Sequence, residues 1–220
     1  MMTPDLERYI LEHISPEDPV LAELDRQTHL RVIQPRMLSG HLQGQLLAML
    51  TAMVRPRRVL ELGTFTGYSA IALARGLTEE GAVLHTVEVN DELEGLAAEY
   101  IEKAGLRDRI VQHIGSALEV VPTLGEVFDL VFVDADKREY PDYYRMLMDG
   151  GFVRSGSIIL ADNVVWYGKV AAETAGDLSV ARNDRQTQGI LEFNRMVRED
   201  ARVEKVILPL RDGLTLIRVK

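Results

Sequence analysis

Two apolar runs of this chain end in residues whose side chains carry oxygen donors. The run at 128–133 leads into Asp134, and the run at 158–161 leads into Asp162 and Asn163. If these runs form neighbouring parallel strands, the three side chains converge at the carboxyl edge of the sheet. Two carboxylates and an amide oxygen suit Mg²⁺ or another hard divalent cation such as Mn²⁺ or Ca²⁺, whereas zinc prefers histidine and cysteine. The pattern predicts a hard-cation site, although each acidic residue alone could belong to an ordinary strand-end turn.

Lys137 lies three residues after Asp134 and is the candidate general base of this site. A lysine can lose its proton near a cation in a closed site, whereas an arginine effectively cannot. Only five of the 25 basic side chains are lysine. A compositional bias would explain the same scarcity, so the general-base role depends mainly on the position beside the expected donors.

A glycine turn after the first β-branched run is the second candidate site. Gly63 and Gly67 are four residues apart, and Phe65 stands where a dinucleotide-binding G-x-G-x-x-G turn would have its second glycine. With Glu61 two residues before the first glycine, the turn favours a cationic ligand without phosphate, such as S-adenosylmethionine. Glu88 ends the next run and could accept hydrogen bonds from ribose hydroxyls, which NAD would also need. Tight packing of a strand on a helix is the alternative explanation for the glycines.

The elements that must position these residues alternate along the chain. Apolar spacing predicts helices from about residue 4 to 54, and short β-branched runs alternate with helical stretches after Pro56. The expected strands are 57–62, 82–89, 109–113, 128–135, 155–164, 203–210 and 214–219, and the expected later helices are 66–77, 91–103, 140–148 and 190–197. This alternation predicts a parallel sheet covered by helices on both faces. Asp212-Gly213 predicts a closing antiparallel hairpin, and 168–188 reads as a surface loop.

Composition limits the class of protein. A chain of 220 residues predicts a single domain, with N-terminal helices over 1–55 and a sheet-containing core over 56–220. The net charge of -9 opposes a broad electrostatic grip on nucleic acid or anionic lipid. The absence of cysteine excludes disulfides, thiolate metal sites and a cysteine nucleophile. With neither a signal-peptide pattern nor a long apolar run, we expect a cytoplasmic protein without a membrane partner.

Four segments, ELGTFTGYS, VEVN, VFVDADK and LADN, occur in this order and together resemble the cation-dependent O-methyltransferases of the catechol and caffeoyl-CoA type. The resemblance extends over roughly residues 35–220. It implies a class I methyltransferase fold of the α/β class, with a Rossmann-like, seven-stranded, mostly parallel sheet and an antiparallel last strand. It also implies extra N-terminal helices that help to shape the substrate pocket, and transfer of a methyl group from S-adenosylmethionine to a hydroxyl.

The resemblance assigns roles to individual residues. It implies metal ligands at Asp134, Asp162 and Asn163 and a catalytic lysine at Lys137. The cofactor contacts that it implies are Ser39, Glu61, Gly63, Thr64, Ser69, Glu88, Ser116, Ala117, Asp134 and Asp136. The implied acceptor is a catechol-like small molecule that chelates the cation through two adjacent oxygens. Lys137 would remove the remaining proton, and the oxygen would attack the sulfonium methyl in line.

Trp166 and Tyr167, which follow the expected metal ligands, bear on the choice of acceptor. Tyr167 stands where the plant caffeoyl-CoA enzymes have a substrate-contacting asparagine, so a CoA thioester is not implied. Trp166 and Tyr167 could form an aromatic wall for a flat substrate or pack in the core beneath the adjoining loop.

Other partners remain open at this point. Some bacterial relatives with these motifs methylate a hydroxyl on a modified uridine of tRNA, so tRNA is an alternative acceptor. Arginines in the N-terminal third could form a basic patch that binds tRNA, or they could belong to a solvated face with salt bridges. These arginines are Arg31, Arg36, Arg55, Arg57 and Arg58. An NAD-dependent oxidoreductase is disfavoured by Phe65 in the glycine turn. Homodimers are usual in the resembling family, so a homodimer is expected here by analogy.

Overall fold

The expected alternation of helices and strands is present in a computed structural model, which describes residues 3–174, 176 and 183–220. Its α-helices are α1 (Pro4–His13), α2 (Pro19–Arg31), α3 (Gly40–Val54), α4 (Tyr68–Arg75), α5 (Glu94–Lys103), α6 (Ala117–Leu124), α7 (Tyr140–Asp149), α8 (Ala171–Thr174) and α9 (Arg185–Glu199). Short 3-10 helices are η1 (Pro35–Met37), η2 (Asp91–Leu93), η3 (Lys137–Glu139) and η4 (Trp166–Gly168). The strands are β1 (Arg58–Leu62), β2 (Val83–Glu88), β3 (Ile110–Ile114), β4 (Leu130–Val133), β5 (Ile158–Asp162), β6 (Val203–Leu208) and β7 (Leu214–Val219).

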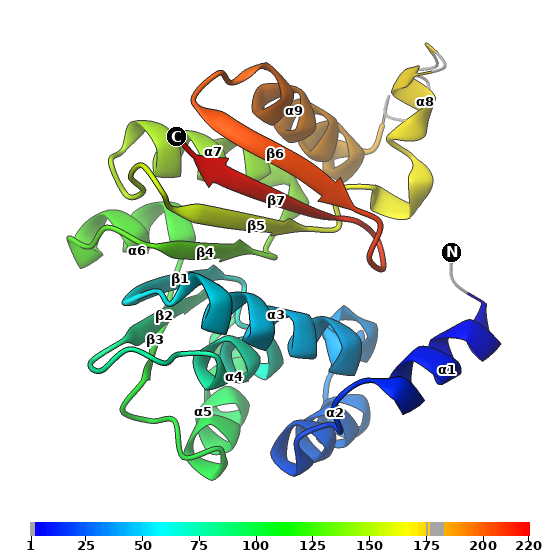
Figure 1. Cartoon of the computed structure of the whole chain (residues 1–220), viewed down its shortest axis with the longest axis vertical. Helices are drawn as coiled ribbons and strands as arrows, with labels where there is room; N and C mark the ends of the chain where they lie inside the picture. The colour runs from blue at the N-terminus through cyan, green and yellow to red at the C-terminus, as the bar shows by residue number, and fades with distance from the viewer. Residues whose placement is uncertain (1–2, 175, 177–182) are drawn as a thin grey trace. The chain divides into compact units, whose positions relative to one another are not determined.

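The strands form one seven-stranded sheet in the order β3-β2-β1-β4-β5-β7-β6 (Figure 1). β2 pairs with β3 and β4 pairs with β5 in parallel, whereas β7 runs antiparallel to both β5 and β6. All four residues of β4 are apolar and buried, as expected of a central strand covered on both faces. The predicted fold class, including the antiparallel last strand, is confirmed.

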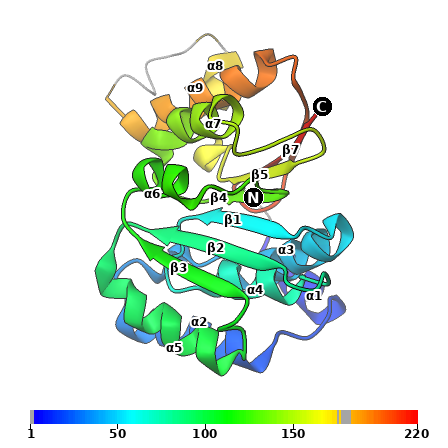
Figure 2. The ribbon, with the colours of Figure 1, turned by 90° about the vertical axis from the view of Figure 1, so that its left-hand side faces the viewer.

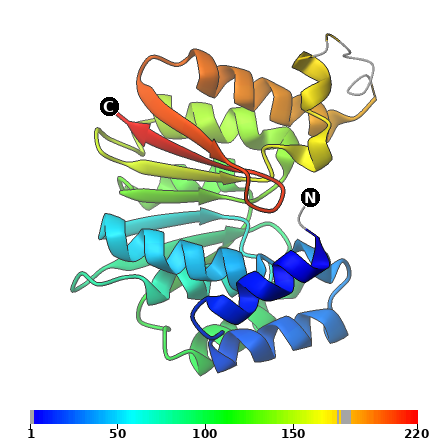
Figure 3. The same cartoon turned by 45° about the vertical axis from the view of Figure 1, so that its right-hand side comes forward.

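The first of two compact units consists of the described residues up to Val59 together with Thr64–Ser116. In this unit α3 packs on α4, and α2 contacts α3, α4 and α5, as the blue to green helices of Figure 3 show. β2 and β3 lie side by side (Figure 2). The buried hydroxyl of Thr28 on α2 donates to that of Thr66 before α4 at 3.0 Å. The N-terminal helices predicted over 1–55 are therefore present, although α1 buries none of its residues.

The second unit consists of Leu60–Gly63 and the described residues from Ala117 to Lys220. In this unit α7 and α9 lie side by side (Figure 1). The buried residues of α9 recur every three or four positions, which makes one face of this helix apolar. Gly189 belongs to that face, and a Cβ at this position would lie 2.2 Å from the carbonyl oxygen of Lys137. The glycine therefore lets α9 pack directly against the backbone of η3. The single-domain organisation predicted from the length stays a prediction.

The segment predicted as a loop over 168–188 is partly helical where it is described. α8 follows η4, and α9 begins at Arg185, earlier than the predicted start at 190. The reason is the Asp184 side chain, which caps α9 by accepting from the backbone N–H of Thr187 at 3.1 Å. The rest of that segment, 175 and 177–182, lies outside the described residues. In the part of the chain that is described, no helix is long and apolar enough to cross a membrane.

Candidate active site

Asp134 leaves the end of β4 in close contact with the glycine turn of the same unit. Its backbone N–H donates to the carbonyl of Leu62 at 2.9 Å. A Cβ on Gly63 would lie 2.3 Å from the carbonyl oxygen of Asp134, and Gly63 has a φ of +98°. Only glycine meets both demands. Gly63 is therefore required by its contact with the backbone that follows β4, which differs from the strand-on-helix packing considered from the sequence. Its role in cofactor binding stays a prediction.

The three predicted metal ligands lie at the ends of two paired strands. The register pairs Val133 of β4 with Ala161 of β5, so Asp134 and Asp162 are the next residues on each side. Asp162 is 2% exposed, and its Oδ1 accepts from the backbone N–H of Asn163 at 2.8 Å. Asn163 has a φ of 59°, a left-handed conformation that asparagine adopts more readily than most residues. The two strand ends are therefore neighbours, as the sequence predicted, and the role of these residues as metal ligands stays a prediction.

Lys137 lies beside the first of these carboxylates. Its side chain is almost fully buried, and its Nζ donates to Asp134 Oδ1 at 2.7 Å and to the hydroxyl of Tyr140 at 2.9 Å. Tyr140 was not singled out in the sequence. The only signal for it was its spacing, because a residue one helical turn after Lys137 can reach the same point.

The Tyr140 hydroxyl is a fully buried donor between two strand ends. It lies 3.0 Å from the carbonyl oxygens of both Val133 and Asp162. Burial, and next the negative charges of Asp134 and Asp162, raise the pKa of Tyr140 well above its ordinary value. The hydroxyl therefore keeps its proton and donates it to these carbonyls.

The donor set fits a hard cation in its chemistry. Among the described residues there is no group of three or more His, Cys, Asp or Glu side chains that could hold a metal. Asp134, Asp162 and Asn163 offer two carboxylates and one amide instead, which is the sparse oxygen set that Mg²⁺ accepts when water or substrate completes its shell. Asp134 Oδ1 lies 2.7 Å from Lys137 Nζ, so the candidate base is directly beside one of the candidate ligands.

The segment after Asn163 is fixed by the β6–β7 hairpin. Trp166 and Tyr167 have φ values of 47° and 54°, which are strained for aromatic residues. The backbone N–H of Tyr167 donates to Asp212 Oδ1 at 2.6 Å, and that of Val165 donates to the Asp212 carbonyl at 2.9 Å. Burial raises the pKa of the Asp212 carboxyl. Tyr167 is 79% exposed, and its role in an aromatic wall stays a prediction.

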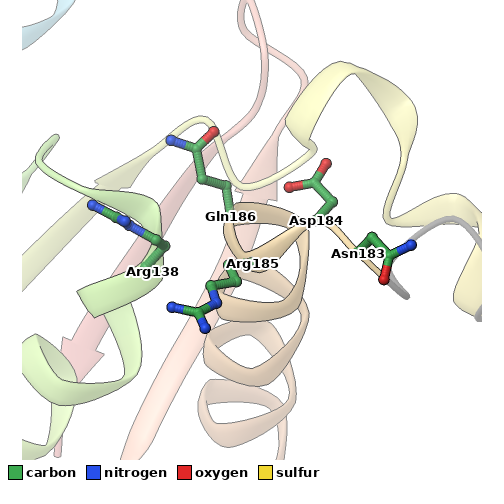
Figure 4. A pocket seen from close by; sticks show the side chains of 5 residues that line it. All are labelled: Arg138, Asn183, Asp184, Arg185 and Gln186. Carbon is green, nitrogen blue, oxygen red and sulfur yellow. The ribbon is translucent and has the colours of Figure 1, made fainter.

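A cavity of about 600 Å³ lies next to η3 and the start of α9 (Figure 4). Its lining residues are Arg138, Asn183, Asp184, Arg185 and Gln186. Two of the charged groups already have ionic partners. Arg138 Nε donates to Asp136 Oδ1 at 2.9 Å, and Lys169 Nζ donates to Asp184 Oδ2 at 2.6 Å.

Asp136, a predicted cofactor contact, stabilises the start of η3 in this unit. Its side chain caps η3 by accepting from the backbone N–H of Arg138 at 3.0 Å. The hydrogen bonds from the Arg138 side chain are the main reason why the pKa of Asp136 is lowered. These bonds fix the residue that follows Lys137.

In the first unit, Glu88, the predicted ribose contact, accepts hydrogen bonds from backbone N–H groups, one of them in the glycine turn. The Glu88 carboxylate accepts from the backbone N–H of Phe65 at 2.8 Å and from that of Asn90 at 2.9 Å. Phe65 has a φ of 49°. Thr64 is buried, and its hydroxyl lies 2.5 Å from that of Thr86. Glu88 is therefore oriented by backbone donors, and lone pairs on its two oxygens remain for a ligand.

The other predicted cofactor contacts are described unit by unit. In the first unit, Ser69 is buried in the first turn of α4, Ser39 is buried just before α3, and Ser116 follows β3. In the second unit, Glu61 is fully buried in β1 and Ala117 begins α6. Their binding roles stay predictions.

Arg31 and Arg55 of the N-terminal arginines pair with carboxylates. Arg31 lies 3.5 Å from Glu99, and Arg55 lies 2.7 Å from Glu79. Such exposed pairs are typical of a solvated face.

Comparison with known proteins adds independent information. A family model described as O-methyltransferase matches residues 11–220. Caffeoyl-CoA O-methyltransferase 1 of Arabidopsis thaliana is 34% identical over 229 residues, which cover 99% of this chain and 85% of the plant protein.

Solved structures agree with this match. The SAH-bound methyltransferase PaMTH1 of Podospora anserina has a TM-score of 0.88 and 30% identity, with 98% of this chain and 94% of that chain covered. The O-methyltransferase TomG of Streptomyces achromogenes, in complex with SAM, has a TM-score of 0.87 and 31% identity, with 98% and 96% covered. The chain therefore belongs to the O-methyltransferase family, which confirms the resemblance to S-adenosylmethionine-dependent O-methyltransferases inferred from its motifs.

Proposed function

We propose that this O-methyltransferase transfers a methyl group from S-adenosylmethionine to one hydroxyl of a catechol-like acceptor, with Mg²⁺ or a similar divalent cation held by Asp134, Asp162 and Asn163. The observation that carries the proposal is the buried Lys137, whose Nζ lies 2.7 Å from Asp134 where β4 ends beside β5. The cofactor is supported by two similar solved structures, one bound to SAH and one to SAM.

The mechanism assigns the proton and the methyl group to definite atoms. A bound cation would supply Lewis acidity that lowers the pKa of the acceptor hydroxyl. Lys137 Nζ accepts the hydroxyl proton. The freed oxygen forms a bond to the methyl carbon as the carbon–sulfur bond breaks, and the sulfonium becomes the neutral thioether of S-adenosylhomocysteine.

The cavity between η3 and the start of α9 is the candidate space for the rest of the acceptor. Its volume of about 600 Å³ lies within the range of roughly 300–1,000 Å³ that is usual for ligand sites. Its lining is polar, with Arg138 and Gln186 among its residues (Figure 4). A small aromatic diol with polar substituents is the acceptor that we propose.

The first test measures cation binding without turnover. Asp162→Ala removes one of two carboxylates, so Mg²⁺ titrated calorimetrically into the variant should give no site-specific heat. Asp142→Ala is the matched control, because Asp142 is exposed on α7 and pairs with Arg145 at 2.8 Å. Wild-type protein and the control should bind the ion equally. Equal binding by the Asp162 variant would overturn the metal assignment.

The second test identifies the acceptor. Labelled S-adenosylmethionine and Mg²⁺ are incubated with vicinal diols, hydroxycinnamoyl-CoA esters and total tRNA, each with and without excess chelator. We expect cation-dependent labelling of diols. Labelling of tRNA alone, or full diol labelling in chelator, would contradict the proposed acceptor or the proposed metal step respectively. We also propose, by analogy with the family, that the protein is a homodimer, and we propose a cytoplasmic location.

A further inference from the structure

Tyr140 is a buried residue that the mechanism above does not use. It is the first residue of α7 and is fully buried. Its hydroxyl lies 2.9 Å from Lys137 Nζ, 3.0 Å from the Val133 carbonyl and 3.0 Å from the Asp162 carbonyl. One hydroxyl thus joins the proposed base to the ends of β4 and β5.

The hydrogen-bonding capacity of these groups limits how they can be arranged. A tyrosine hydroxyl has one proton and can also accept. Its proton goes to the two strand-end carbonyls, so toward Lys137 it acts as the acceptor. The hydroxyl is therefore anchored by backbone that belongs to the sheet.

The ring of Tyr140 also packs against neighbouring groups. Phe193 of α9 packs edge-on against it, with ring centroids 5.4 Å apart and an interplanar angle of 79°. Lys137 Nζ lies 4.9 Å from the centre of the Tyr140 ring. α9 also packs directly on the carbonyl of Lys137 at Gly189, where an added Cβ would lie 2.2 Å from that oxygen.

We propose that Tyr140 is the positioning residue of Lys137. The nitrogen of Lys137 is tetrahedral, and the Asp134 carboxylate and the Tyr140 hydroxyl occupy two of its three positions besides the bond to Cε. One position remains, and this is the position that can face the acceptor hydroxyl. This inference depends on the proposed function for its catalytic meaning, whereas the fixed lysine can be measured without an acceptor.

The first experiment compares two tyrosines of the same helix. Tyr140→Phe keeps the ring and removes the hydroxyl. Tyr144→Phe is the matched control, because Tyr144 is also buried, also packs edge-on against Phe193, and donates to Asp200 Oδ2 at 3.0 Å. We expect kcat to fall about 10- to 100-fold in the Tyr140 variant, as for a misplaced catalytic group, with KM for S-adenosylmethionine unchanged. The control should keep wild-type kcat. A wild-type kcat for Tyr140→Phe would overturn the proposal.

A double-variant cycle separates positioning from a general structural role. If Tyr140 acts through Lys137, adding Tyr140→Phe to Lys137→Ala should lower kcat no further. A loss of the same factor in both backgrounds would refute the proposal.

Should Tyr140→Phe fail to fold, Tyr140→4-aminophenylalanine keeps two N–H donors for the carbonyls but offers Lys137 only a weak acceptor. Native stability with reduced kcat supports the inference, and native stability with wild-type kcat overturns it.

The closing measurement needs no substrate and so distinguishes this inference from the proposed function. The chain has five lysines, so selective ¹³C labelling of lysine gives a simple spectrum, which Lys137→Ala assigns. The two Hε protons of Lys137 should have separate shifts in wild-type protein and in Tyr144→Phe, and should merge in Tyr140→Phe. Unchanged, separate shifts in Tyr140→Phe would show that the hydroxyl does not fix the lysine, whatever acceptor the enzyme uses.

Discussion

Replacing Gly63 by alanine should damage the metal site through the backbone of Asp134. Both Gly63 and Gly67 belong to the glycine turn and have similar φ values, 98° and 93°. An added Cβ at Gly63 lies 2.3 Å from the Asp134 carbonyl and needs about 0.7 Å more to reach 3.0 Å, whereas at Gly67 the nearest atom, on Ala97, is 3.5 Å away. The two variants therefore share the conformational strain and differ in steric overlap.

These contacts give an expected magnitude for each variant. A left-handed alanine costs roughly 1–2 kcal/mol of folding free energy, and overpacking adds about 1–3 kcal/mol. Gly67→Ala should lose only the first amount, and Gly63→Ala the sum of both. For a chain of this size each kcal/mol lowers Tm by about 2–4 °C.

Differential scanning calorimetry measures the loss of stability, and Mg²⁺ titration measures the effect on Asp134. Gly63→Ala should melt below Gly67→Ala and bind Mg²⁺ more weakly. Equal melting temperatures for the two variants would refute the reasoning from steric overlap. Unchanged Mg²⁺ affinity in Gly63→Ala would show that the displaced backbone is not that of the metal ligand.

Two further predictions concern protonation and stability. Lys137→Ala should lower kcat about 10²- to 10⁴-fold, which is the usual contribution of a general base. The affinity for S-adenosylmethionine, measured by calorimetry, should stay within about twofold of wild type. A kcat equal to that of wild type would remove Lys137 from the mechanism. Hydrogen bonds from Arg202 lower the pKa of Asp200 from 3.8 to about 2 in the folded protein. The ionised carboxylate therefore stabilises the fold fully at pH values above the unfolded pKa of Asp200. This stabilisation is lost as the pH falls through the folded pKa. Asp200→Asn should therefore lower the free energy of unfolding by about 1–2 kcal/mol at pH 7, and urea titrations between pH 5 and pH 2 should show the difference shrink, whereas a constant difference would contradict this account.

The sequence was sufficient to predict those features of the fold that depend on the order of helices and strands along the chain. Alternating runs predicted the parallel strands, and the residues after two of these runs predicted Asp134 and Asp162 at neighbouring strand ends, as the register shows. This prediction worked because the carboxyl ends of parallel strands must meet at one edge of a sheet. The Asp212-Gly213 pair likewise predicted the closing hairpin.

Features that depend on tertiary packing were not accessible in this way. Tyr140 has the appearance of an ordinary core aromatic until the fold places its hydroxyl between two strand ends. Asp212 was recognised only as a turn residue, because its bond to Tyr167 joins positions 45 residues apart. The start of α9 was a missed local signal, since Asp184 followed by Thr187 is a recognisable cap.

The hairpin that fixes the segment after Asn163 imposes an order on protein synthesis. β6 and β7 leave the ribosome after every other described strand, yet β7 pairs with β5 inside the sheet and the Asp212-Gly213 turn holds the backbone N–H groups of Val164 and Val165. A nascent chain can therefore build β4 and β5 before the segment after the candidate metal ligands has its anchor. That segment therefore gains its hydrogen bonds to the Asp212-Gly213 turn only after the hairpin has been translated.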